Sequence, residues 1–215
     1  MPPTVFVVDD DDDLRESLIA LLWALGHSAM AFASSEEFLS YYDDQPGCLV
    51  LDIQMPGQNG IELYEELLLK GKRIPVIFIT AHATISTAVA ALRTGAIDFL
   101  EKPFERQILA DRIDRALQAD ANWRASEARY RSLDQAIRDL NANDRETLEM
   151  VIRGETNKAM AAKLLITERA IELRRQRLMK RLNVRTVPEL LELTVTHRVL
   201  AEVRNLNQQR PFPGS

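Results

Sequence analysis

The sequence predicts an α/β domain with a doubly wound, five-stranded parallel sheet, joined by a long helix to a smaller all-α domain. Three observations indicate this. Short apolar runs alternate with amphipathic helical patterns over the first 105 residues. A stretch without glycine or further proline follows Pro103, and the remainder is helical in pattern. A chain of 215 residues is long enough for two modest domains, each with its own core.

Five apolar runs predict the strands of the sheet, at residues 4–8, 28–32, 48–52, 75–80 and 97–100. Helical patterns separate them, at 14–25, from Ser34 onward, at 59–70 and at 84–93. Repeated strand–helix alternation requires right-handed crossovers and a parallel sheet covered on both faces. The expected strand order is the flavodoxin-like 2-1-3-4-5, in which ligands collect outside the carboxyl ends of the strands, beside the first one.

Residues 104–140 predict one long helix. Apolar or small side chains recur every seven residues along it, at Leu109, Ala116, Trp123, Tyr130 and Ile137. Two interpretations remain open for this stripe: a helix lying on its own domain, and a two-chain coiled coil over about 120–140, which we favour. The predicted boundaries are a first domain at 1–120, a helical linker at 121–140, a second domain at 141–203 and a disordered tail at 204–215.

The second domain reads as four helices. Asn143-Asp144 precedes the first, and Gly154 ends it. A short, small-sided helix opens at Asn157, and a brief turn at 165–167 follows. An arginine-rich helix runs from Glu168 to about Leu182, and the last helix covers about 187–203, with Pro188 tolerated in its first turn.

Charge divides the chain in the same way. Residues 1–140 carry 13 basic against 23 acidic side chains, a net of -10, and residues 141–215 carry 14 against 9, a net of +5. An acidic half joined to a basic half suggests a metal-and-phosphate module attached to a nucleic-acid module. No stretch approaches the roughly 20 apolar residues of a membrane span. With no signal peptide visible, we expect a cytoplasmic protein without membrane attachment. The single Cys48 excludes an intrachain disulfide and a cysteine-based zinc cluster.

Polar side chains end four of the predicted strands. The acid pair Asp9 and Asp10 follows the first strand, Asp52 ends the third, Thr80 the fourth, and Lys102 follows the fifth. Carboxylates gathered at one sheet edge repel one another unless a cation intervenes. An oxygen-rich, incompletely caged site suits Mg2+.

These residues and their spacing resemble the receiver domain of bacterial two-component response regulators. The resemblance implies that Asp52 is phosphorylated and that Asp10 and Asp52 bind Mg2+ directly. It implies further metal contacts from Asp9, through water, and from the backbone carbonyl of Gln54. Lys102 and Thr80 would bind phosphoryl oxygens, and Pro103 matches the family's cis-proline. Phe99 fits the aromatic switch position, with an ordinary edge-strand aromatic as the alternative.

The segment from Asn157 to Val184 resembles the LuxR-type helix-turn-helix. Ile171, Leu178 and Leu182 share one apolar face of the arginine-rich helix. Another face carries side chains suited to the major groove of double-stranded DNA. We expect Glu172, Leu173 and Gln176 to reach base edges and Arg169, Arg175, Lys180 and Lys158 to hold phosphates. The alternative is a solvated basic surface. Ala170-Ile171 and Arg174 stand where the family usually carries Thr-Val and a histidine.

Together these parts resemble the FixJ/NarL class of transcriptional regulators. The implied function is a transcription factor that a sensor histidine kinase switches by phosphorylating Asp52, with a homodimer then binding promoter DNA. No enzyme activity is expected beyond its own phosphorylation and dephosphorylation. A free-standing aspartyl-phosphate enzyme would need a general acid two residues after its nucleophile, and Gln54 cannot serve. The other alternative is a phosphorylation-independent DNA-binding regulator with a vestigial receiver, against which the complete acid and lysine set argues.

Overall fold

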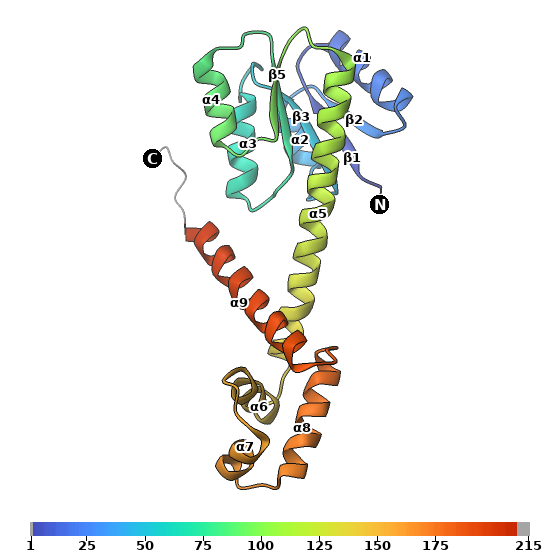
Figure 1. Cartoon of the computed structure of the whole chain (residues 1–215). Coiled ribbons are helices and arrows are strands. Elements are labelled where there is room, and N and C mark those ends of the chain that lie inside the picture. Colours follow the sequence, from blue (N-terminus) through green and yellow to red (C-terminus); the bar gives the residue numbers. More distant parts are fainter. Residues whose placement is uncertain (1, 210–215) are drawn as a thin grey trace. The chain divides into compact units, whose positions relative to one another are not determined.

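The computed structural model describes the backbone of residues 2–209 and the side chains of residues 2–202. The chain divides into two compact units, with the boundary between Arg124 and Ala125. Helix α5 (Arg106–Arg138) contributes residues to both units (Figure 1). Among the described residues, no helix is long and apolar enough to cross a membrane.

Unit 1 is built on a five-stranded parallel sheet. Its strands are β1 (Thr4–Val8), β2 (Ser28–Phe32), β3 (Gly47–Asp52), β4 (Val76–Thr80) and β5 (Asp98–Glu101). They lie in the order β2-β1-β3-β4-β5, and all four neighbouring pairs are parallel. The predicted fold class and strand order are confirmed, and the predicted strand bounds differ from the observed ones by one residue at most.

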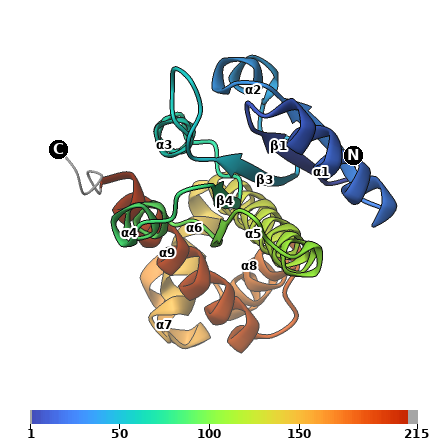
Figure 2. The same cartoon turned by 90° about the horizontal axis from the view of Figure 1, so that it is seen from above.

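Helices cover both faces of the sheet, as Figure 2 shows from above. Helices α1 (Asp12–Ala24) and α5 pack on one face, where the strand side chains include Val5 and Val7. Helices α2 (Ser35–Tyr41), α3 (Gly60–Leu69) and α4 (Ile85–Arg93) pack on the other, against Phe6 and Val8 among others. The alternation follows from the strand geometry, because successive side chains point to opposite faces.

Short polar side chains begin four of these helices. Asp11, Ser34, Asn59 and Thr84 each accept a hydrogen bond from a backbone N–H of the first turn. At α3 the bond is reciprocal, because the Glu62 side chain also accepts from the N–H of Asn59. These caps satisfy backbone donors that a helix leaves without an internal partner. These caps therefore fix the residue at which each helix begins, next to the carboxyl edge of the sheet.

Three residues of the seven-residue stripe of α5, Leu109, Ala116 and Tyr130, are buried within the chain. Leu109 and Ala116 belong to the core of unit 1. In unit 2, the Tyr130 ring stacks on His197 at 5.3 Å between centroids, and Ile137 packs on the core. These contacts agree with the interpretation of a helix lying on its own domain. The coiled coil between two chains stays a prediction.

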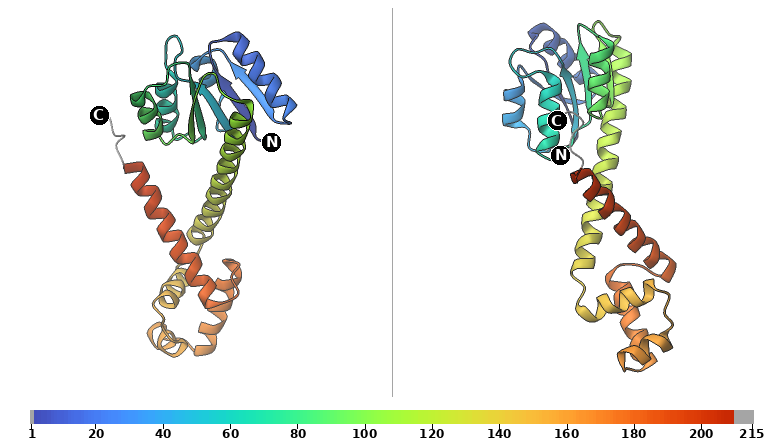
Figure 3. Two further views of the ribbon diagram at one scale, coloured as in Figure 1. Left: turned by 45° about the horizontal axis from the view of Figure 1, so that its top comes forward. Right: turned by 90° about the vertical axis from the view of Figure 1, so that its left-hand side faces the viewer.

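Unit 2 contains the end of α5 and four further helices: α6 (Ala142–Ile152), α7 (Asn157–Leu164), α8 (Glu168–Arg181) and α9 (Val187–Gln209). Helices α6, α7 and α8 pack together, and α9 crosses the end of α5 (Figure 3). Their shared core includes Leu148, Met160, Ile171, Leu178 and Leu190.

Two predicted boundaries in unit 2 were wrong. Helix α6 begins before Asn143-Asp144, because Asn141 is its N-cap and Asp144 is a buried first-turn residue that accepts a bond from Arg181. Helix α9 continues to Gln209, through residues 204–209 that were expected to be disordered. That segment contains neither glycine nor proline before Pro211, so nothing in it breaks a helix. Residues 210–215 of the expected tail lie outside the described residues.

Candidate phosphorylation site and DNA-binding surface

The acids at the carboxyl edge of the sheet lie together. Asp9 follows β1 and is fully buried, whereas its neighbour Asp10 is exposed. The N–H of Asp11 donates to Asp9 Oδ1 at 2.9 Å. One carboxylate oxygen each from Asp9, Asp10 and Asp52 lies within 4.8 Å of the other two. The structure therefore brings the three predicted metal-binding acids into one cluster.

Asp52 is the last residue of β3 and is almost completely buried. The N–H of Gln54 donates to Asp52 Oδ1 at 2.9 Å, which leaves Oδ2 for another partner. Gly60 at the start of α3 lies against this strand end, and a Cβ there would come 2.1 Å from the Asp52 carbonyl oxygen. Only glycine allows that approach, so the helix start and the acid are held close together.

Lys102 joins the two buried acids. Its Nζ lies 2.7 Å from Asp9 Oδ2 and 2.6 Å from Asp52 Oδ2. The peptide bond between Lys102 and Pro103 is cis. Burial is the largest influence on the pKa of Asp9 and raises it, although the bond from Lys102 acts in the opposite sense. Burial alone would lower the pKa of Lys102, but hydrogen bonds to Asp52 and Asp9 raise it overall.

The acid cluster fits a hard divalent cation. All of its donor atoms are carboxylate oxygens, and two of the three acids are buried while Asp10 faces solvent. Oxygen ligands with an open side are what Mg2+ prefers, because it keeps several of its waters. The backbone N–H of Gln54 donates to Asp52, and the role of its carbonyl oxygen as a metal ligand stays a prediction from the family resemblance.

Thr80 and Phe99 lie on the strands beyond Asp52. Thr80 is the buried last residue of β4, and its Oγ1 accepts a hydrogen bond from the N–H of His82 at 3.2 Å. The hydroxyl is thus held by its own loop rather than by the acids. Phe99 in β5 is half-buried and packs on the core that α2, α3 and α4 cover.

Arg15 is a neighbour of the site to which sequence reasoning assigned no role. Its Nη1 donates to the Asp9 carbonyl oxygen at 2.5 Å, and its Nη2 pairs with Asp12. Arg15, in the first turn of α1, therefore joins the start of this helix to the end of β1. In the sequence, only its position shortly after the run of aspartates could have indicated this role.

Helices α7 and α8 form a helix-turn-helix. Thr156 and Thr167 cap the two helices, and Leu165 between them adopts the left-handed conformation, with φ of 53°. The predicted apolar face of α8 is buried, with Ile171 and Leu178 fully covered and Leu182 nearly so. The short turn and the shared core therefore fix α8 against α7.

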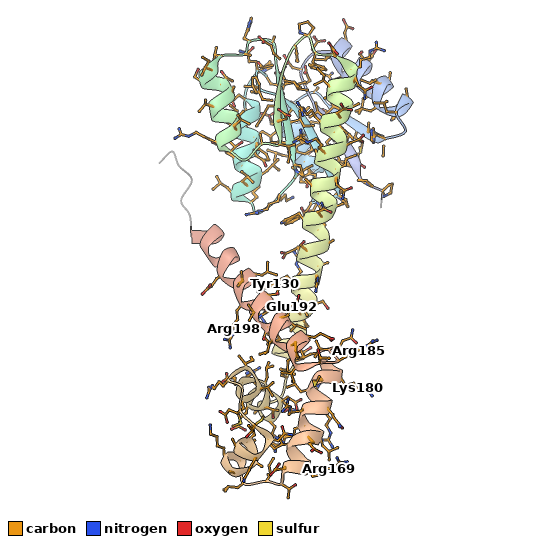
Figure 4. All side chains as sticks on the ribbon, in the orientation of Figure 1. Tyr130, Arg169, Lys180, Arg185, Glu192 and Arg198 are labelled. Carbon is orange, nitrogen blue, oxygen red and sulfur yellow. The ribbon has the colours of Figure 1, made fainter. Side chains whose placement is uncertain are left out.

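The opposite face of α8 is exposed. It carries Arg169, Leu173, Gln176 and Lys180, with Glu172 half-exposed beside them. Arg169 and Lys180 lie near opposite ends of the helix (Figure 4). Lys158 at the start of α7 is also exposed. Arg177 and Arg185 add exposed cations that the sequence-based assignment did not include. Arg177 belongs to the arginine-rich helix that marked this region, whereas Arg185 follows the end of α8.

Arg175 lies away from this exposed face. It is half-buried, and its Nη1 donates to the Asn157 side chain at 2.5 Å. This bond joins the middle of α8 to the first residue of α7. Arg175 therefore sits between the two helices, while the other predicted contact residues lie on exposed surface.

Two family models match this chain. The response regulator receiver domain covers residues 5–114, and the bacterial regulatory proteins of the luxR family cover residues 139–194. The first match alone spans half of the chain and contains the whole acid, threonine and lysine set. The chain belongs to the two-component response regulators.

Several known proteins resemble it over most of its length. Nodulation protein W of Bradyrhizobium diazoefficiens is 35% identical over 193 residues, which cover 89% of this chain and 85% of that protein. Transcriptional regulatory protein FixJ of Azorhizobium caulinodans is 34% identical, over 89% and 91%. The response regulator StyR has a similar structure, with a TM-score of 0.85 and 42% identity over 91% of this chain and 100% of that one. Full-length FixJ from B. japonicum matches with a TM-score of 0.56 and 32% identity, over 92% and 98%.

This response regulator is therefore a transcriptional regulator of a two-component system. Its receiver domain takes input from a kinase, and its LuxR-type domain binds DNA. Together the two matched domains are those of a DNA-binding regulator rather than of a classical enzyme.

Proposed function

We propose that a sensor histidine kinase activates this response regulator by donating a phosphoryl group to Asp52 in the presence of Mg2+. The observation that carries the proposal is the bond of Lys102 to both Asp9 and Asp52. A lysine placed between two buried acids at the carboxyl edge of a parallel sheet serves a ligand site, because ligands of open α/β sheets bind there.

Each residue of the site would have its own role in the transfer of the phosphoryl group. Once Lys102 lets go of it, Oδ2 of Asp52 would attack the phosphorus of the kinase's phosphohistidine, and the N–P bond would break to release the histidine ring. Bound Mg2+ would offset the charge of the anionic partners and orient them. Asp10 and Asp52 would bind the ion directly, Asp9 through water, and Gln54 through its carbonyl. Lys102 would exchange its bond to Asp52 for a phosphoryl oxygen, as a point charge.

Thr80 would bind a second phosphoryl oxygen with its hydroxyl. The hydroxyl would donate its proton to that oxygen while turning toward Asp52, and the β4–α4 loop, whose His82 N–H donates to the same hydroxyl, would move with it. That movement opens space that Phe99 can enter, and the surface of α4, β5 and α5 then repacks. Three exposed apolar side chains already lie on α4: Ile85, Val89 and Leu92. We therefore propose that phosphorylation favours a homodimer about this surface.

The dimer would bind promoter DNA in the cytoplasm, with α8 of each copy in the major groove. Gln176 can pair with adenine, Leu173 can meet a thymine methyl, and Glu172 can accept from cytosine. The cations Lys180, Arg169 and Lys158 are exposed and would contact phosphates. Arg175 could add a phosphate contact only with the N–H groups that Asn157 leaves available.

Labelling with acetyl phosphate and Mg2+ tests the phosphorylation site. One residue, Asp52, should acquire an acid-labile acyl phosphate, and Asp52→Asn should abolish it. Asp13→Asn is a matched control, because Asp13 is an exposed acid of α1 in the same acidic run and has no proposed metal role. Labelling that persists in Asp52→Asn would contradict the assignment.

Mapping protected DNA separates this proposal from a regulator with a vestigial receiver. Phosphorylation should tighten or extend protection by the parent chain and leave the Asp52→Asn variant unchanged. Identical protection with and without phosphorylation would favour the vestigial receiver instead. Sedimentation of the same samples reports whether the dimer forms or tightens.

A further inference from the structure

Arg169 and Glu172 form an ion pair on the exposed face of α8. Arg169 Nη1 donates to Glu172 Oε2 at 2.8 Å, one helical turn along. The two side chains keep 74% and 45% of their surface exposed. Arg169 is the second residue of the helix, so the pair lies at the end of α8 that follows the turn. Residues at this end of a groove-binding helix reach base edges.

Helix stability does not account for this pair. The start of a helix carries partial positive charge, which disfavours a cation such as Arg169. Exposed ion pairs three residues apart contribute little, and an acid preceding the base is the better order, whereas here the base comes first. Residues that break local stability rules concentrate at functional sites.

DNA binding explains why the two side chains would be paired. A lone carboxylate on a surface facing the duplex is repelled by the phosphates. The positive charge of Arg169 offsets the negative charge of Glu172, so the pair as a whole presents little net charge to the DNA. The carboxylate occupies one N–H of the guanidinium and limits its rotation, which leaves the remaining N–H groups of a planar fork available to a ligand.

We propose that Arg169 and Glu172 act as one unit that reads a guanine in the major groove. Arg169 donates to guanine O6 and N7, the bidentate contact that its fork matches. Glu172 is a positioning residue that holds the guanidinium without contacting the base. The inference rests on insertion of α8 into the groove, as proposed above, and replaces the separate roles of phosphate contact for Arg169 and cytosine contact for Glu172.

Selection of bound duplexes from a randomised library tests this unit. The probe is the full-length protein treated with acetyl phosphate and Mg2+, and the bound DNA is sequenced. Arg169→Ala and Glu172→Gln should relax the preference at one and the same base pair, by about tenfold for guanine over the other bases with Arg169→Ala. The double variant should relax that position no further than Arg169→Ala alone, because the two residues act on one contact.

Arg169→Lys separates base reading from charge. It keeps the cation but loses the planar fork, so guanine preference should fall while the salt dependence of binding stays that of the parent chain. Glu149→Gln is the matched control. Glu149 pairs with Arg153 at 3.0 Å on α6, with 53% and 65% of the side chains exposed, and that variant should select the parent sequence.

Two outcomes would overturn the inference. One is that Glu172→Gln relaxes a different base pair from Arg169→Ala, which would make Glu172 itself a base reader. The other is that Arg169→Ala weakens binding to all sequences alike, which would make Arg169 a phosphate contact. If the parent chain selects no sequence at all, the proposed groove insertion of α8 fails, and this inference fails with it.

Discussion

Arg124 lies beside the carboxylate of Asp120, one helical turn earlier in α5, with its Nε 2.9 Å from both carboxylate oxygens. Asp120 is only 2% exposed and also accepts from the N–H of Gly47 at 2.9 Å. Arg124 Nη2 donates in turn to the Gln45 carbonyl at 3.0 Å. Both residues of the pair follow the segment that matches the receiver family, which ends at residue 114. The added turns of α5 are therefore joined to the start of β3, the strand that ends at Asp52.

Removing the Arg124 side chain should destabilise unit 1. In Arg124→Ala the Asp120 carboxylate stays buried with only the Gly47 N–H as its partner, which costs about 2–4 kcal/mol. Urea unfolding followed by near-UV absorption of the receiver aromatics measures this. Lys70→Ala is the matched control, because Lys70 is an exposed cation of unit 1 that pairs with Glu66 one turn earlier, and its loss should cost under about 0.5 kcal/mol. Equal costs for the two variants would contradict the role of the buried pair.

The contact between α5 and α9 should stabilise unit 2. His197 stacks on Tyr130 and lies 2.9 Å from Asp134 Oδ1. His197→Ala removes both contacts and should cost about 1–3 kcal/mol. Thr196→Ala, at the exposed neighbouring position, is the control. Helix loss in urea, recorded for both variants, checks the difference. Tyr130 and His197 both lie outside the segment that matches the LuxR-type family, residues 139–194, so this contact would extend the stable domain beyond that segment.

Mg2+ binding should weaken as the pH falls. Burial raises the pKa of Asp9, so this acid takes up a proton at a higher pH than an ordinary aspartate. Ionisation of a group whose pKa is raised in the folded state disfavours folding, and this cost disappears as the pH falls through that pKa. Bound Mg2+ offsets the free-energy cost of ionised Asp9 in the folded state, and it can do so only at a pH at which Asp9 is ionised. The Mg2+-induced rise in Tm should therefore be larger at about pH 8 than at about pH 5. An equal rise at both, or no rise with the parent chain, would count against the metal site.

Gln176 and Lys180 should affect DNA binding in different ways. Gln176→Ala should relax the preference at one base pair by about 1–3 kcal/mol, because a base contact is lost. Lys180→Ala should weaken binding to all sequences alike and lower the slope of log affinity against log salt by about one unit. Binding across salt and across a small operator library distinguishes the two. The reverse pattern would mean that a different face of α8 meets the DNA.

Local patterns in the sequence were sufficient for the strands and the helix-turn-helix. Alternating apolar runs predict β1 to β5 because each strand of a parallel sheet is buried on both faces. Asp52 ends an apolar run, which predicts its position at the end of a strand. Its place beside Asp9 and Asp10 could be predicted because the carboxyl ends of parallel strands share one edge. The apolar face of α8 followed from helical periodicity alone. The first helix boundary error, at α6, arose because Asn143-Asp144 was assigned to the start of the helix, whereas the N-cap is Asn141 two residues earlier.

Only the tertiary structure decided which polar groups form bonds. The strand ends predict that Lys102 and Asp9 share one sheet edge, but not that Lys102 donates to both Asp9 and Asp52. Gly47 and Asp120 are 73 residues apart, and no sequence pattern pairs them. The stripe of α5 illustrates the limit. Its seven-residue period is the same whether its partner is another chain or the chain's own core, and the structure places Leu109 and Tyr130 in contacts within the chain. The period of apolar side chains indicates that one face of a helix is covered by an apolar partner. Which segment or chain supplies that partner depends on how distant segments pack.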